Sequence, residues 1–429
     1  MTSKPTNFLV QIGSLSQVLP KLRPRRPPVI ESHDCGSGCL GGGGFTRDKD
    51  RFSAAIWRMG VNGEDVTLIS NLSGNSWGLG ISEDFELFAS SANKVPALHI
   101  HVPYPYFDAV GLKKEPALQI FDYSTFYPVT VTRQGDHFGS YTAAAGFDIY
   151  TARSFPERFW NKTAFVGAPT GKLLGNFQLK EDEEGSYTAE NEGSFVASFD
   201  ETTAPIQGKT GPDGNVYMID WNNLIMMHGG HLENPLRDKS HGRIYRITHE
   251  DSKKFHELNL RNADTEELIN TLNDDNMFWR MMAQQKLVQG KKYDAIPSLI
   301  NLAKSENLDG IGSNPAAIHA LWTLHGLGQL DGSNDEAISA VKTALYHPSA
   351  MVRKNAVQVL PKTNESAQLL ANMLEEQNFN TLRHILLRLS VMPKNDEFGE
   401  IIYKLKNEIE GMKALQAPYN LALIRHGSN

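Results

Sequence analysis

Hydrophobic positions follow two different periods along the chain, and the period changes near residue 253. Before that point apolar residues alternate with polar ones over short runs, as in Asn215–Asp220, a pattern typical of β-strands. After it they recur every three to four positions, as in Ala350–Leu360, which predicts amphipathic helices. We therefore expect a sheet-rich domain over residues 33–250 and a helical domain over residues 260–429. Residues 1–32, rich in Pro, Ser and Arg, should be poorly ordered.

The sheet-rich domain repeats a unit of short strands separated by turns. One unit runs from Ile56–Met59 through the N-S-W-G of Asn75–Gly78, and others occupy Ala143–Lys172 and Gly175–Ser198. Short strands at regular spacing are the signature of a β-propeller, whose blades are four-stranded sheets. Roughly 215 residues hold about four to five blades, so we predict an incomplete, all-β propeller.

The helical domain repeats paired helices. The clearest start is His347–Ala356, where a proline turn leads into a helix with Val352 and Ala356 on its apolar side. Helix pairs at a period of roughly 30–45 residues are typical of a HEAT-like solenoid. Such arrays present a concave face, through which we expect a protein partner to bind.

Composition limits the function. The net charge is −7, from 42 basic and 49 acidic residues, which disfavours a nucleic-acid partner. No run approaches the roughly 20 apolar residues of a membrane span, and no apolar leader is visible. Cys35 and Cys39 form C-x-x-x-C rather than the C-x-x-C-H of c-type haem, so no haem motif is present. A disulfide, a metal pair and two free thiols stay open for them.

The stretch Gly211–Thr248 carries most of the candidate chemistry. It holds a G-P-D-G turn, a strand ending at Asp220, an irregular run and a second strand, Arg243–Thr248. Lone buried charges cost several kcal/mol, so its charged groups must lie at a surface, in a salt-bridged corner or around a ligand. Two interpretations stay open, a ligand site and a structural corner that closes the propeller against the helices. The candidates are Asp220, Asn222, His228, His231, Arg237, His241 and Arg243.

Strand geometry adds expectations for other charged residues. Arg243 and Arg246 lie three apart, so they should point to opposite faces, where each can pair with a carboxylate such as Asp238 or Asp220 on its own side. His99 and His101 share a strand face, which favours a polar face turned to solvent or to the channel over a metal site. Loop residues are further candidates, namely Asp136, His137, His33 and Asp34.

The motif G-P-D-G-x-x-Y-x-x-D-W-x-N, followed by H-G and N-P-x-R-D-x-x-H-G-R-I-x-R-I-T, resembles the end of the propeller in a known family. This is the PVC-type haem-binding family of membrane-bound dehydrogenase-like proteins. The resemblance implies a propeller related to glucose and sorbosone dehydrogenases, HEAT-like repeats, and export to the periplasm or cell envelope.

For a dehydrogenase, the resemblance also implies a histidine base and groups that hold pyrroloquinoline quinone and Ca²⁺. The base would be His241 or His228, and the cofactor-binding residues would be Arg237, Arg243, Asp220 and Asn222.

Two departures from the family pattern precede the G-P-D-G turn. Ala204 stands where the family has arginine, and Gln207 stands where it has aspartate, so a cation and a carboxylate are missing. Two functions therefore stay open. One is a quinoprotein-type dehydrogenase that oxidises sugars or alcohols. The other is a non-catalytic propeller that recognises a glycan or a protein, with the helices as a docking arm.

Overall fold

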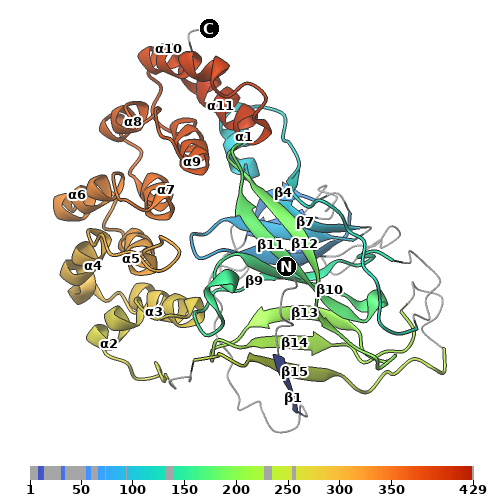
Figure 1. Ribbon diagram of the computed structural model, residues 1–429. Helices are drawn as coiled ribbons and strands as arrows, with labels where there is room; N and C mark the ends of the chain where they lie inside the picture. Colours follow the sequence, from blue (N-terminus) through green and yellow to red (C-terminus); the bar gives the residue numbers. More distant parts are fainter. Residues whose placement is uncertain are drawn as a thin grey trace.

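Figure 1 shows the computed structural model, in which sheets lie on one side of the molecule and an arc of helices lies on the other. The structure describes residues 8–13, 30–33, 55–58, 66–72, 74–92, 94–131, 139–226, 234–253 and 258–427. These residues form four sheets of antiparallel strands and helices α1 to α11.

Three of the sheets are meanders, because strands that are neighbours in the sheet are also neighbours in sequence. The first contains β2 (Ile30–His33), β3 (Ala55–Arg58) and β4 (Thr67–Asn71). The second contains β5 (Ser76–Ile81), β6 (Leu87–Ser91), β7 (Val95–His99) and β8 (Leu118–Gln119). The third contains β9 (Ala145–Ile149), β10 (Thr163–Ala168), β11 (Leu173–Glu181) and β12 (Tyr187–Ala197).

The fourth sheet joins the two ends of the strand-rich region. Its order is β1-β15-β14-β13, with bounds Phe8–Gly13, Arg243–His249, Val216–Asp220 and Pro205–Thr210. β1 pairs with β15 from Phe8 opposite His249 to Gly13 opposite Ile244. The segment 1–32 thus contributes a strand that we did not expect, because the edge of β15 offers unpaired backbone groups to it.

The sheets pack through one edge strand each, since β2 contacts β5, β5 contacts β9 and β9 contacts β13. The backbones approach so closely that a Cβ atom on Gly78 would lie 2.4 Å from the backbone of Gly146 and Phe147. The glycine of the N-S-W-G motif is therefore required by the contact between β5 and β9.

Helix α1 (Tyr104–Val110) interrupts the strand-rich region between β7 and β8, and it ends at Gly111, whose φ is +73°. The other helices follow residue 258. They are α2 (Thr265–Thr271), α3 (Met277–Gln289), α4 (Ile296–Ala303), α5 (Pro315–Gly326), α6 (Asp335–Ala344), α7 (Ala350–Val359), α8 (Asn364–Ala371), α9 (Phe379–Leu389), α10 (Asp396–Lys404) and α11 (Lys413–His426).

The helices after residue 258 form two rows. Helices α3, α5, α7 and α9 contact one another in sequence and make an inner row that faces the sheets (Figure 1). Asparagine side chains cap the first turns of α3, α5, α6, α9 and α10. One hydrophobic core, with Leu321, Val357 and Leu386 at 0% exposure, runs along the array. Within the described residues, no helix is both long enough and apolar enough to cross a membrane.

Candidate functional site

Asp220 and Arg243 lie opposite each other on β14 and β15. Arg243 donates from Nε to Asp220 Oδ2 over 2.8 Å and from Nη1 to Asp200 Oδ2 over 2.6 Å. Its Nη2 donates to the hydroxyls of Thr202 and Thr203. All three guanidinium nitrogens are engaged, and the ion pair neutralises a carboxylate that is only 1% exposed.

Arg246 donates from Nε to Asp213 Oδ2 over 2.6 Å. The two arginines thus pair with separate carboxylates, and Asp220 is the expected partner of Arg243, but the partner of Arg246 is Asp213 rather than Asp238.

Asp238 organises the loop that leads into β15. Its carboxylate accepts from the backbone N–H groups of Ser240 and His241 and from Asn222 Nδ2, the last over 3.0 Å. The hydrogen bonds from Ser240 and His241, above all the one from the Ser240 N–H, lower the pKa of Asp238 to about 2. His241 Nδ1 lies 2.9 Å from Asp238 Oδ2, and the His241 side chain is 73% exposed. A histidine oriented by a carboxylate has the arrangement of a general base.

The structure brings some of the predicted residues together. They form two neighbouring polar clusters. The first is the pair of Asp220 and Arg243. In the second, Asp238 joins Asn222 to His241. Arg237 lies over the ring of Trp221 at 5.2 Å. Other candidates lie outside the described residues, namely Asp34, Cys35, Cys39, Asp136, His137, His228 and His231.

The corner formed by Asp220 and Arg243 does not close the sheets against the helices, which corrects one of the two interpretations drawn from the sequence. The G-P-D-G turn makes that contact instead. Asn276 Nδ2 donates to the Gly211 carbonyl, and Trp279 Nε1 donates to the Pro212 carbonyl, each over 2.8 Å. The turn precedes the first residue of β14, and Asp220 is the last residue of that strand. The corner therefore lies at the end of β14 that points away from the helices.

The described residues of the corner do not fit a quinone cofactor with Ca²⁺. Arg243 is committed to two aspartates, so it has little left to offer a cofactor carboxylate. Asp220 also accepts from the backbone N–H groups of Ala204 and Asn222. Ala204, where the family has arginine, is completely buried. No group of three or more His, Cys, Asp or Glu side chains suited to a metal occurs in the described part of the chain.

His99 and His101 are buried at 0% and 2% exposure, so the expectation of a face turned to solvent or to a channel is wrong. His99 Nε2 lies 3.2 Å from Glu86 Oε2, and its Nδ1 lies 2.7 Å from Ser186 Oγ. Burial lowers the pKa of His99 to about 4. The pKa of His101 is also lowered by burial. These histidines face a buried ionic network between the sheets and the helices.

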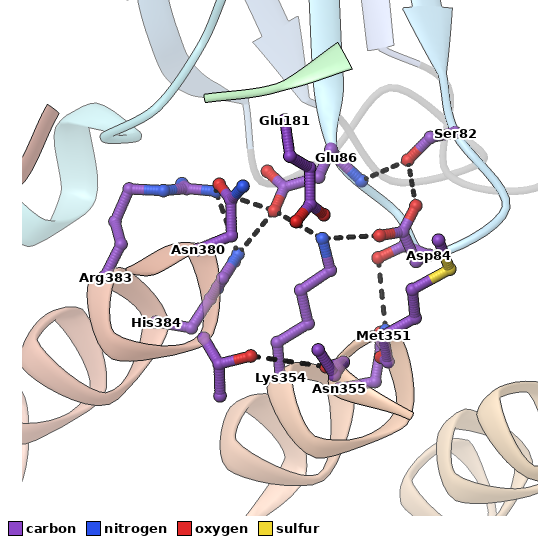
Figure 2. A network of polar contacts seen from close by, with 12 residues as sticks. Ser82, Asp84, Glu86, Glu181, Met351, Lys354, Asn355, Asn380, Arg383 and His384 are labelled. Atoms are coloured by element: carbon purple, nitrogen blue, oxygen red, sulfur yellow. Dashed lines mark hydrogen bonds and ion pairs between the residues drawn. The ribbon is translucent and has the colours of Figure 1, made fainter. Parts of the chain in front are cut away.

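The turn between β5 and β6, Ser82–Glu86, projects into this network, and we call it the acidic hairpin (Figure 2). Its carboxylates Glu83, Asp84 and Glu86 are 0%, 1% and 3% exposed. Ser82 Oγ donates to Asp84 Oδ1 over 2.6 Å and accepts from the Glu86 N–H, which shapes the turn. Phe85, at φ +65°, packs edge-on against the rings of His319 and Trp322 in α5.

Cations from two helices of the inner row meet the acidic hairpin. Glu86 Oε1 accepts from Arg383 Nη2 over 2.6 Å, from His384 Nε2 over 2.8 Å and from Lys354 Nζ over 2.9 Å. Lys354 also forms an ion pair with Asp84. Burial raises the pKa of Glu86, but Arg383, Lys354 and His384 outweigh it, and the pKa lies well below its usual range. The inner face of the helices is thus engaged by a segment of the same chain.

A cleft of about 400 Å³ lies where the G-P-D-G turn meets α2 and α3, and we call it the junction cleft. Arg153, Ser154 and Lys253 line it from the sheet side. Residues of the helical side complete the lining, among them Asn270, Asn273, Asp274, Asp275 and Trp279. The cleft therefore needs both halves of the chain.

Several polar groups of the junction cleft are uncommitted. Within the described residues, the buried hydroxyl of Ser154 has no hydrogen-bond partner. The side-chain amides of Asn270 and Asn273 line the cleft from exposed positions and form no hydrogen bond to the described residues. Lys253 Nζ lies 3.1 Å from Asp275 Oδ2 in an exposed pair. No sequence motif pointed to this set, because its members come from segments that carry no shared pattern.

Comparisons with known proteins give one family and several distant structures. The model of the family described as "Domain of unknown function (DUF7133)" matches residues 36–251. No match was found among the curated proteins.

Among solved structures, the chain is similar to the soluble aldose sugar dehydrogenase from Escherichia coli. The identity is 15%, the match covers 48% of this chain and 57% of that chain, and the TM-score is 0.29. For a glucose dehydrogenase the identity is 15%, the match covers 45% of this chain and 54% of that chain, and the TM-score is 0.25. For a luciferin-regenerating enzyme the identity is 15%, the match covers 47% of this chain and 53% of that chain, and the TM-score is 0.26. The similarity to sugar dehydrogenases is thus weak, and the chain spans about half the length of these structures.

Proposed function

The chain belongs to the family described as a domain of unknown function (DUF7133), and on that premise we propose that it is a non-catalytic binding module. Its ligand is a sugar or another small polyhydroxylated molecule, held in the junction cleft. The observation that carries the proposal is the uncommitted polar lining of this cleft, Ser154, Asn270 and Asn273, beside the ring of Trp279.

The chemistry of the lining suits hydroxyl groups. A side-chain amide offers two donors and one acceptor oxygen, so each asparagine can bind a pair of neighbouring hydroxyls. The partly exposed ring of Trp279 offers an apolar surface on which the C–H face of a sugar ring can pack. The volume of about 400 Å³ lies within the range of small-molecule sites, roughly 300–1,000 Å³.

A larger hollow of about 710 Å³ lies between the tip of the β11–β12 hairpin and the helices α9 and α11. Four of its nine lining residues carry carboxylates, namely Asp182, Glu183, Glu184 and Glu410. Its two side-chain amides, of Gln377 and Asn378, already donate to the Glu375 carbonyl and to Glu181. A neutral sugar gains less there, because ionised carboxylates accept hydrogen bonds but cannot donate them. The junction cleft offers both roles, and we therefore favour it.

The finer architecture belongs to the same proposal. We propose that the four sheets are blades of an incomplete β-propeller, supported by the successive contacts between the edge strands β2, β5, β9 and β13. We also propose that α2 to α11 form a HEAT-like solenoid, supported by the two rows of helices. Export to the periplasm or cell envelope remains part of the proposal by resemblance. A protein partner of the helices would meet a surface other than the inner row, which the acidic hairpin occupies.

Calorimetric titration with a panel of monosaccharides and disaccharides tests the binding function. The Asn270→Ala/Asn273→Ala double variant should bind the best ligand roughly thirtyfold more weakly, because two hydrogen bonds of about 1 kcal/mol each are lost. Asn301→Ala, on the exposed side of α4, is the matched control and should bind as the unaltered protein does. Binding to no sugar, or equal affinity in all variants, would refute the proposal.

A quinoprotein-type dehydrogenase acting on sugars or alcohols is the second candidate. The exposed His241, oriented by Asp238, is the observation that favours it. A dye-linked oxidation assay with added pyrroloquinoline quinone and Ca²⁺, run beside the His241→Ala variant, separates the two candidates. Oxidation that depends on His241 would establish the enzyme in place of the binding module.

A further inference from the structure

Glu83 of the acidic hairpin connects both walls of the junction cleft. Its carboxylate oxygens accept from Arg153 Nη1 and Nη2 over 2.6 and 2.7 Å, and Arg153 lines the cleft from the sheet side. Glu83 Oε2 also lies 3.1 Å from Arg280 Nη2. Arg280 in turn donates from Nη1 to the carbonyl of Asp274, in the helical wall, over 2.7 Å. One carboxylate thus links the two walls.

Water does not screen this bridge. The side chains of Glu83, Arg153 and Arg280 are 0%, 4% and 1% exposed. Without the carboxylate, two guanidinium groups would face each other in a medium of low dielectric constant. Arg153 would keep its ion pair with Asp309, but Arg280 would lose its anionic partner. Buried charges without a partner are strongly unfavourable, so the walls would separate or admit water.

The other carboxylates of the acidic hairpin do not reach the cleft. Asp84 and Glu86 bind Lys354 of α7 and Arg383 of α9, further along the array. The hairpin therefore carries two functions in neighbouring residues, since Glu86 fastens it to distant helices and Glu83 spans the cleft.

We propose that Glu83 is a positioning residue that fixes the width of the junction cleft, an inference that rests on the proposed ligand site. The cleft is then preorganised for its ligand, and binding depends on a residue that does not line it. Preorganisation raises affinity because the ligand does not have to order the walls itself.

The experiment compares Glu83→Gln with Glu86→Gln in the full chain. The two variants remove one buried negative charge each from the same hairpin, and only the first touches the cleft walls. Glu83→Gln should weaken sugar binding roughly tenfold and speed hydrogen exchange of the backbone amides at residues 270–276. Glu86→Gln should change sugar affinity by less than about twofold, and it should speed the exchange of these amides no more than that of amides elsewhere in the helices.

The two readouts separate the two proposals. If the unaltered protein binds no sugar, the ligand site is refuted, while faster exchange at residues 270–276 in Glu83→Gln alone still supports the positioning role. Equal exchange in both variants, or equal affinity in both, would overturn the positioning role. If Glu83→Gln does not fold, Glu83→Asp shortens the bridge while keeping the charge, and the same differences are expected in smaller size.

Discussion

Replacing Glu86 by glutamine keeps the shape of the side chain and removes one charge from the buried network. In the folded protein Glu86 and Asp84 balance Lys354 and Arg383, all with side chains at most 3% exposed. The two imidazoles that contact Glu86, those of His99 and His384, have pKa values lowered by burial and are neutral near pH 7. Among these four buried groups the charges cancel, and Glu86→Gln leaves them with one uncompensated positive charge, which the half-buried Glu181 beside Lys354 offsets only in part.

The size of the effect follows from that imbalance. Breaking a buried ion pair by removing one partner costs about 3–5 kcal/mol, and solvent does not reduce the cost here because the groups are buried. Lys354→Met creates the opposite imbalance, with Asp84 and Glu86 against Arg383 alone, and should cost a similar amount. The double variant restores neutrality, so its loss should be smaller than the sum of the two single losses by about 1–3 kcal/mol.

Urea unfolding followed by far-UV circular dichroism measures these differences for the protein, both single variants and the double variant. Ser339→Ala, in α6 outside the network, serves as the control for general handling. The reasoning fails if Glu86→Gln loses less than about 1 kcal/mol, or if the losses of the two single variants add without coupling.

Three further predictions concern the sheets. Arg243→Ala leaves the buried carboxylate of Asp220 without its cation and should lower the free energy of unfolding by about 2 kcal/mol or more. Arg246→Ala removes a more exposed pair and should lower it by about 1 kcal/mol or less in the same chemical unfolding experiment. Equal losses in the two variants would contradict this prediction. Gly78→Ala places a Cβ atom 2.4 Å from the backbone of β9 and should cost about 1–3 kcal/mol in chemical unfolding, and an unchanged midpoint would show that the strands can move apart. The pKa of His99 falls from 6.5 to about 4 on folding, so His99 binds fewer protons in the folded state, and its contribution to stability is full above pH 6.5. As the pH falls towards 4 the free energy of unfolding decreases, by about 2 kcal/mol at pH 5. In unfolding experiments across this range His99→Gln should reduce the dependence of the free energy of unfolding on pH, and an unaltered dependence would exclude His99 as its source.

Local patterns in the sequence predict several parts of the structure. The alternation before Asp220 and the run from Arg243 correspond to β14 and β15, and the three-residue spacing of Arg243 and Arg246 predicts their separate partners. The proline turn at His347–Ser349 leads into α7, as expected. These features depend on residues close together in sequence, which is why periodicity and turn chemistry detect them.

The acidic hairpin and the junction cleft depend instead on residues far apart in sequence. Three carboxylates within Ser82–Glu86 have the composition of a solvated turn, and their burial is possible only because Arg280, Lys354 and Arg383 lie opposite them. Arg383 and Glu86 are 297 positions apart. Charged residues at helical spacing are ordinarily a solvated face, so no local signal distinguishes these from others.

A crystal structure of the protein soaked with the sugar that binds best would test the account most directly. The account predicts density for the sugar in the junction cleft, against the Trp279 ring and within hydrogen-bond distance of Asn270 or Asn273. Density at Arg243 and His241 instead, with the junction cleft empty, would contradict it.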